Sequence, residues 1–181
     1  MALAIIILAL IGTTLAIAGR VLFPQIDSPG HVDAIVVVAG SSDDRYAYAR
    51  FLAESGTADR VLVSRPTGNR AYFDEIDSYC AASPVRAPDG RDIEIECFTP
   101  DTNTTSGEVS ATTRIAHENG WDSLLAVTYW GHVSRVRIYL QQCFSGDVYV
   151  TDTPRSTRIS KRYALTHEIG GHVKAILQPA C

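Results

Sequence analysis

The chain has 181 residues, which is long enough for one domain with a sizeable core, and 46% of them are hydrophobic. Its formal net charge is −4, and it contains no block of Lys and Arg and no basic helix, which excludes nucleic acid as a partner. It lacks both the glycine-rich P-loop ending in Gly-Lys-Ser or Gly-Lys-Thr and the Gly-x-Ser-x-Gly elbow, which excludes P-loop ATP hydrolysis and an elbow serine nucleophile.

Residues 1–20 form the first predicted segment. The stretch Ala2–Gly19 carries no charge, and its roughly 18 residues are about the minimum for a helix that spans a bilayer. Two interpretations stay open: an uncleaved membrane anchor, or a signal peptide cut after Ala18, where Ala16-Ile17-Ala18 has small residues at the required positions. Because the basic region that opens a signal peptide is missing, we expect an anchor.

The remainder is predicted to be a linker at 21–32 followed by one domain at 33–181. In that domain short β-branched runs alternate with helical segments, which is typical of a parallel sheet covered on both faces. We expect strands at 33–39, 60–64, 93–98, 124–128 and 148–151, and helices from about 44 to Gly56, at 71–81, 108–119 and 133–143, and from about 158 to 177. This predicts an α/β fold, Rossmann-like and doubly wound, with a mainly parallel five-stranded sheet and helices on both faces.

The four cysteines indicate in which cellular compartment the domain lies. Cys80, Cys97, Cys143 and Cys181 are an even number and form no CxxC pair, so two structural disulfides are the simplest interpretation. We favour Cys80 with Cys97 and Cys143 with Cys181 among the three possible connectivities, and four reduced thiols remain the alternative. Two disulfides would place the domain on the extracytoplasmic side of the cell membrane.

Polar side chains follow the predicted strands where they end. In a parallel sheet these loops emerge at one edge, which is where ligands bind in open α/β sheets. Convergence of arginines there would make an anion pocket, with His132 available for proton transfer. The expected substrate-binding residues are Gly40, Asp44, Arg45, Arg65, Thr105, Thr128 and Arg135, and the expected catalytic residues are His132 and Glu108.

Structural interpretations compete with these roles. Thr105-x-x-Glu108 fits a capping box, in which each side chain satisfies a free amide at a helix start. Asp43 or Asp44 fits a simple helix cap. His132 near a helix start should stay neutral, because the helix dipole opposes a proton there.

Metals and cofactors are not expected. His167 and His172 flank a segment that superficially resembles a zinc motif, but their spacing of five puts them on different helix faces. No Cys, His and carboxylate cluster elsewhere suggests a metal site.

Several motifs resemble the YdcF/SanA/ElyC-like family of envelope-associated proteins. They are residues 33–37, 44–45, 56–64, 103–108 and 127–135, the last reading VTYWGHVSR. The resemblance implies a Rossmann-like domain, often anchored by one N-terminal helix, with roles in envelope integrity and polyprenyl-linked glycan metabolism. It places the family's polar positions on Asp44, Arg45, Thr105, Glu108, Thr128, His132 and Arg135. The sequence departs from the family after its first two strands, where it has fewer glycines.

Three functions remain open at this point. The first is a membrane-anchored extracytoplasmic enzyme, a hydrolase or transferase acting on a phosphate-bearing, polyprenyl-phosphate-linked precursor by metal-independent acid/base chemistry. The second is a non-catalytic module that binds a nucleotide-like, adenosyl or lipid-phosphate ligand. The third is a structural partner of envelope synthases, which requires an exposed apolar patch.

Overall fold

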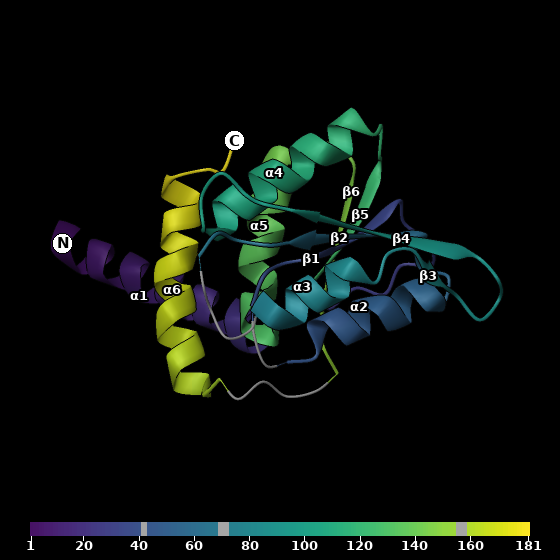
Figure 1. The fold of residues 1–181 in the computed structure, drawn as a ribbon. Helices are drawn as coiled ribbons and strands as arrows, with labels where there is room; N and C mark the ends of the chain where they lie inside the picture. Colours follow the sequence, from purple (N-terminus) through teal and green to yellow (C-terminus); the bar gives the residue numbers. More distant parts are fainter. Residues whose placement is uncertain (41–42, 69–72, 155–158) are drawn as a thin grey trace.

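The computed structural model describes residues 1–40, 43–68, 73–154 and 159–181 (Figure 1). Ser41 and Ser42, residues 71–72 of the second expected helix and Arg158 of the last one lie outside the described residues. The helices are α1 (Ala2–Leu22), α2 (Arg45–Glu54), α3 (Phe73–Ala81), α4 (Thr105–Glu118), η1 (Trp130–His132), α5 (Val133–Cys143) and α6 (Lys161–Leu177). The strands are β1 (Ala34–Val37), β2 (Arg60–Ser64), β3 (Val85–Arg86), β4 (Asp92–Phe98), β5 (Ser123–Thr128) and β6 (Asp147–Asp152).

The strands form one mixed sheet in the order β3-β4-β2-β1-β5-β6. All neighbours pair in parallel except β3, which pairs antiparallel with β4 at the edge. The five expected strands are confirmed, but the expected total of five is wrong because β3 adds a sixth. Two residues are too few to show a strand period in the sequence. The arrangement is α/β and consistent with a Rossmann-like fold, with β1 between β2 and β5 in the middle of the sheet.

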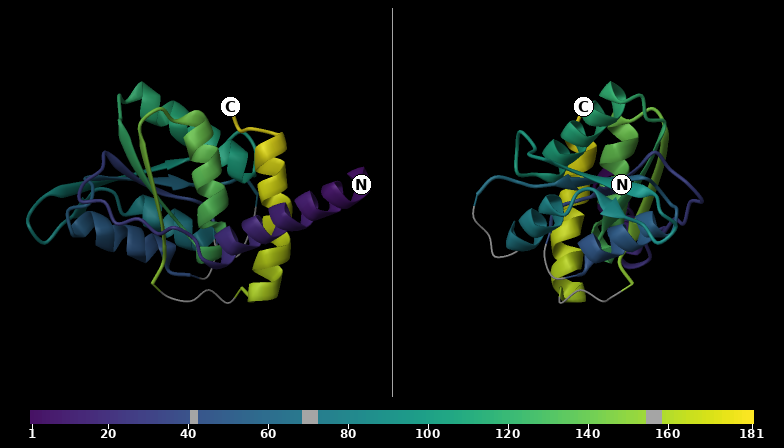
Figure 2. Two further views of the ribbon diagram at one scale, coloured as in Figure 1. Left: turned by 180° about the vertical axis from the view of Figure 1, so that it is seen from behind. Right: turned by 45° about the vertical axis from the view of Figure 1, so that its right-hand side comes forward.

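Helices pack against both faces of the sheet (Figure 2). On one face α2 and α3 cover a core that includes Ile35 and Val63, and on the other α4 and α5 cover Val36 and Ala126. Strand β1 is buried along its whole length, as its continuous β-branched run predicts. The two helical layers leave the carboxyl ends of the central strands open between them.

Two disulfides close the fold, and both expected pairings are confirmed. Cys80 of α3 is bonded to Cys97 of β4, which encloses the β3 hairpin. Cys143, at the end of α5, is bonded to Cys181, which follows α6. The second bond fixes α6 beside α5, and α6 forms one wall of the site described below.

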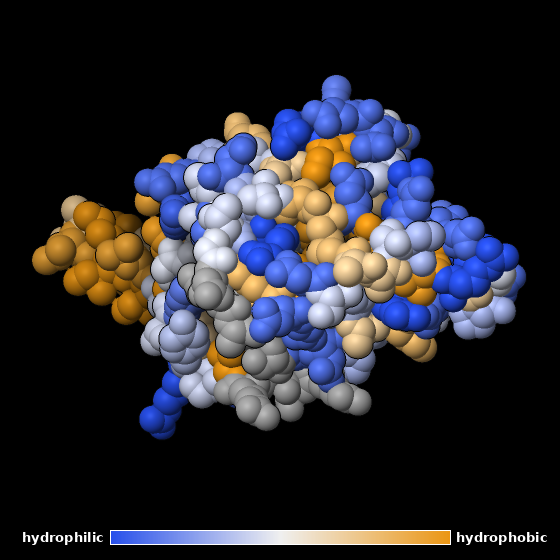
Figure 3. All heavy atoms as spheres, in the orientation of Figure 1, coloured by the Kyte–Doolittle hydropathy of each residue, from blue (hydrophilic) through white to orange (hydrophobic). Residues whose placement is uncertain are grey.

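Helix α1 is long and apolar enough to cross a membrane, judged by length and composition. It projects from the domain as an apolar rod (Figure 3) and crosses α6 before the chain enters the sheet (Figures 1 and 2). The expected linker is docked on the domain: the Asp27 carboxylate pairs with Arg137 at 2.6 Å and accepts a hydrogen bond from the Val150 amide.

Candidate functional site

A cleft of about 680 Å³ opens at the carboxyl edge of the sheet. It is bordered by the segments that follow β1, β2, β4 and β5, so the expected convergence of strand ends occurs. Helix α6 forms the opposite wall. The lining residues are Ala39, Pro66, Asn103, Thr104, Thr105, Glu108, His132, Arg135, His167, Gly170, Gly171 and Lys174.

Arg135 is held in the cleft wall by a carboxylate from α6. Its Nε donates to Glu168 Oε2 at 2.7 Å and its Nη2 to Glu168 Oε1 at 3.1 Å. The Nη1 atom donates to Thr105 Oγ1 at 3.0 Å. Because a guanidinium has five N–H donors, two remain without a partner among the described residues. Arg135 can therefore bind an anion in the cleft while it stays anchored.

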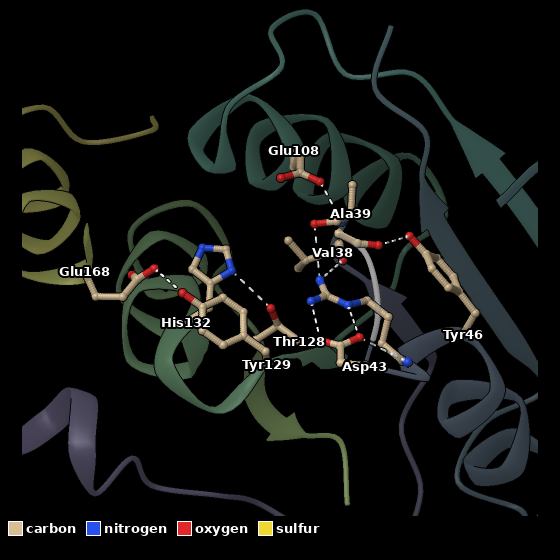
Figure 4. Close-up of polar contacts among 11 residues, drawn as sticks. Val38, Ala39, Asp43, Tyr46, Glu108, Thr128, Tyr129, His132 and Glu168 are labelled. Atoms are coloured by element: carbon tan, nitrogen blue, oxygen red, sulfur yellow. Dashed lines mark hydrogen bonds and ion pairs between the residues drawn. The ribbon is translucent and has the colours of Figure 1, made fainter. Parts of the chain in front are cut away.

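His132 lies between two hydroxyl groups, of which Figure 4 shows that of Thr128. Its Nδ1 is 3.0 Å from Thr128 Oγ1 and its Nε2 is 3.2 Å from Thr105 Oγ1. Each hydroxyl can donate or accept, so either tautomer of the neutral ring is satisfied. Burial, reinforced by the positive charges of Arg135 and Arg45, holds the pKa of His132 well below 6.5. Both the burial and the neighbouring charges therefore favour the neutral form of the imidazole.

Glu108 reaches across from α4 to the end of β1. Its Oε1 accepts a hydrogen bond from the Ala39 amide at 2.8 Å (Figure 4). Burial raises the pKa of Glu108, although that hydrogen bond and the charges of Arg45 and Arg135 act in the opposite direction. A buried carboxyl with a raised pKa is suited to proton transfer.

The expected capping box at the start of α4 is wrong. The N-cap is Thr104, whose hydroxyl accepts from the Gly107 amide at 3.1 Å, and the Glu108 side chain points away to Ala39. The first amide positions of α4 border the cleft at Thr104 and Thr105, and the positive end of the helix dipole favours an anion there.

Arg45 is brought to the same edge but is enclosed. It forms an ion pair with Asp43 at 2.5 Å and donates to the carbonyl groups of Val38 and Ala39. Only 2% of Arg45 is exposed, and it contributes to a shallow extension of the cleft of about 210 Å³. Gly40 lies against it, since a Cβ there would come within 2.5 Å of the guanidinium.

Three expected binding residues, Arg65, Asp44 and Thr128, do not line the cleft. Arg65 pairs with Asp77 at 2.7 Å and covers the ring of Phe73 at 4.0 Å, so it faces α3. Asp44 occupies the N-cap position of α2 with φ of 56° and no side-chain cap bond, while the Asp43 carboxylate accepts from the Arg45 amide. Thr128 is fully buried and reaches the cleft only through His132.

The α6 wall contains the residues that the sequence did not suggest as a site. Glu168 is fully buried and also accepts a hydrogen bond from the Tyr129 hydroxyl at 2.8 Å. Gly171 lies directly against Arg135, because a Cβ there would come within 2.6 Å of Nε. Two adjacent glycines inside a helix cost stability, so the Gly170-Gly171 pair was the feature of the sequence that could have indicated a functional role for this helix.

Chemically, the site combines a neutral imidazole, a buried carboxyl, two threonine hydroxyls and an anchored guanidinium. Among the described residues no group of three or more His, Cys, Asp or Glu is placed to hold a metal ion. Comparison with known proteins finds no family model that matches the chain and no curated protein that matches it.

Proposed function

We propose that the domain, a doubly wound Rossmann-like unit, is a membrane-anchored extracytoplasmic enzyme acting on a phosphate-bearing envelope precursor. A polyprenyl-phosphate-linked glycan is the proposed substrate class, in keeping with the YdcF/SanA/ElyC-like motifs. The proposed reaction is metal-independent hydrolysis or transfer, and the cleft beside α6 is the proposed active site.

The observation that carries this proposal is that Glu108 and His132 line one cleft together with the anchored Arg135. Burial raises the pKa of Glu108 and lowers that of His132. These opposite directions suit Glu108 to the role of acid and His132 to that of base. Glu108 would donate a proton to the leaving oxygen, and His132 would accept one from the attacking water or alcohol. The negative charge of a bound substrate would raise the proton affinity of His132.

Anion binding is supported by three features of the cleft. Arg135 has two N–H donors to spare among the described residues, Lys174 lines the same wall, and the start of α4 directs its dipole inward. Thr105 connects Arg135 to His132 through its hydroxyl, so charge on the ligand would be felt at the imidazole.

The test uses the full chain in detergent micelles with inorganic phosphate, pyrophosphate, polyprenyl phosphate and a polyprenyl-pyrophosphate-linked sugar. A ligand at a hundred times its dissociation constant should stabilise the fold by about 2.7 kcal/mol, visible as a higher melting temperature. Arg135→Ala should abolish this shift. Glu108→Gln should keep it and lose product formation, measured by mass spectrometry.

Arg65→Ala is the matched control, because Arg65 is also paired with a carboxylate but lies outside the cleft. It should bind and turn over the ligand like the unchanged protein. Wild-type turnover in both Glu108→Gln and His132→Gln would reject the acid/base mechanism. The absence of any anion-dependent shift would reject the whole proposal.

A second candidate is a non-catalytic module that binds a nucleotide-like, adenosyl or lipid-phosphate ligand. The observation that favours it is the restraint of His132, whose two ring nitrogens are both engaged by hydroxyls. This candidate predicts a melting shift that Arg135→Ala removes, with no product from any ligand.

A further inference from the structure

Helix α6 presents an apolar stripe to solvent near its end. Val173, Ile176 and Leu177 are 43%, 59% and 74% exposed, and their spacing of three and four residues puts them on one side of the helix. Apolar residues gathered on a surface mark an interaction site more often than single ones do.

The charged residues of α6 are almost all positive. Lys161, Arg162 and Lys174 are exposed, although the chain as a whole is acidic. Within Lys161–Leu177, which is described throughout, the one carboxylate is Glu168, and it is buried against Arg135. Exposed apolar residues and exposed cations on one helix also occur in helices that lie in a membrane interface.

The direction of α1 relates α6 to a bilayer. Residues Ala2–Ala16 are exposed, whereas Ile17 and Val21 are buried on the domain, and the Ser134 hydroxyl donates to the Arg20 carbonyl. Helix α1 runs crosswise to α6 and projects beyond it on the side turned away from the sheet (Figures 1 and 2). If α1 is perpendicular to a membrane, α6 is therefore roughly parallel to its surface.

The point at which α1 joins the domain sets how close that surface comes. Helix α1 is exposed up to Ala16 and packs on the domain through Ile17 and Val21, and it contacts α6. A bilayer that covers the whole exposed stretch of α1 therefore reaches the domain beside α6.

We infer that α6 lies on the surface of the bilayer that α1 spans, with Val173, Ile176 and Leu177 inserted at the headgroup boundary. The exposed cations of α6 face anionic headgroups. Because His167, Gly170 and Lys174 also line the cleft, the helix that contacts the membrane forms one of its walls. A lipid-borne anion can then enter the cleft without leaving the bilayer. The inference concerns the membrane contact and does not require the cleft to be catalytic.

Tryptophan quenching tests this contact in the full chain, reconstituted into bilayers of phosphatidylcholine and phosphatidylglycerol. Ile176→Trp adds a probe to α6, and Phe51→Trp adds one to α2; both parent side chains are 59% exposed. Lipids brominated near the headgroup end of the acyl chains should quench most of the emission added by Ile176→Trp. They should leave the emission added by Phe51→Trp unchanged.

Leu177→Trp, at a 74% exposed position, is a second probe in case Ile176→Trp folds poorly. Added emission that is not quenched at either α6 position would overturn the inference, as would equal quenching at Phe51. If α6 contacts a second copy of the chain and not the bilayer, the emission added at the α6 positions would not be quenched, and the inference would be overturned. The quenching is read without any ligand, so it can succeed or fail independently of the anion-dependent melting shift.

Discussion

Arg45 and Arg135 both lie at the carboxyl edge of the sheet, and both form a two-bond pair with a buried carboxylate. Arg45 pairs with Asp43, two residues away, and its Nη1 donates to the carbonyl groups of Val38 and Ala39, which follow β1. Arg135 pairs with Glu168, 33 residues away on another helix, and borders the cleft. The pair of Arg45 with Asp43 holds the loop between β1 and α2. The pair of Arg135 with Glu168 joins α5 to α6 in the wall of the cleft, and Arg135 can still bind an anion there.

The difference teaches that an arginine at a strand end is not by itself a ligand contact. What decides is how many of its donors the fold uses, and whether the rest border a cavity. Four predictions can break or sharpen this contrast.

The largest effect is expected from Asp43→Ala, which leaves the enclosed Arg45 without its partner. Removing one member of a buried ion pair costs about 3–5 kcal/mol of unfolding free energy, which chemical denaturation would measure. Asp77→Ala is the control, because Asp77 forms the same kind of two-bond pair with Arg65 at the surface and should change stability little. Equal effects of the two substitutions would refute the fastening role of Arg45.

Cys181→Ser tests whether the Cys143–Cys181 disulfide supports the ion pair between Arg135 and Glu168. The loss of the Cys143–Cys181 bond should lower the unfolding free energy by about 2–4 kcal/mol and weaken anion binding, because α6 carries Glu168. Cys80→Ser should lower stability without changing the anion-dependent melting shift, since the bond to Cys97 lies away from the cleft. A melting shift that both substitutions reduce equally would contradict this difference.

Gly171→Ala tests the packing of α6 on Arg135. The added Cβ would come within 2.6 Å of Nε and 2.7 Å of Cδ, so the guanidinium must move. We expect a loss of about 1–3 kcal/mol of unfolding free energy, together with weaker anion binding. At Gly170 no described atom lies within 4 Å of the added Cβ, so Gly170→Ala should stabilise the helix by up to about 1 kcal/mol. A stabilising Gly171→Ala would show that Arg135 does not need this approach.

The smallest effect is a dependence of stability on pH. The folded state binds the His132 proton only well below 6.5, whereas the unfolded chain binds it near 6.5. The unfolded state therefore holds more protons in that window, and stability falls as the pH decreases from about 6.5. The contribution of His132 is at most about 1.4 kcal/mol per pH unit.

His132→Gln keeps a polar side chain without a titrating ring, so its stability should fall less steeply over the same window. His172 contributes in the same direction in both proteins, because burial lowers its pKa as well. Denaturation curves collected between pH 7 and 5 would compare the two slopes. Equal slopes would show that the His132 pKa is not lowered in the folded state.

The parts of the fold with a strong local pattern could be predicted from the sequence. The β-branched run of β2 and the amphipathic α5 have the predicted bounds, and the spacing of the cysteines favoured the observed disulfides. The two-residue β3 could not be predicted, because it is defined by pairing with β4 and not by its own residues. The N-cap of α4 could not be predicted either, because Thr104 and Thr105 are adjacent and both are suitable caps; the structure has Thr104 at this position.

The candidate site was predictable only in part, for a related reason. The sequence places His132 and Arg135 after a strand, and both line the cleft. It does not show that Glu168, 33 residues further along the chain, forms an ion pair with Arg135. Nor does it show that Arg65 turns to Asp77 and away from the cleft. Contacts between distant segments depend on packing, which a local pattern does not encode.

The packed last turns of α1 have a consequence for processing of the chain. The possible cleavage site after Ala18 lies between Ile17 and Val21, both buried on the domain. A protease needs this segment unfolded, so cutting and packing compete for the same residues. If the domain folds first, its packing on Ile17 and Val21 protects the site; if cutting comes first, Ile17 and the apolar helix before it are lost. The order of the two events in time thus determines whether the domain keeps α1, which is long and apolar enough to cross a membrane.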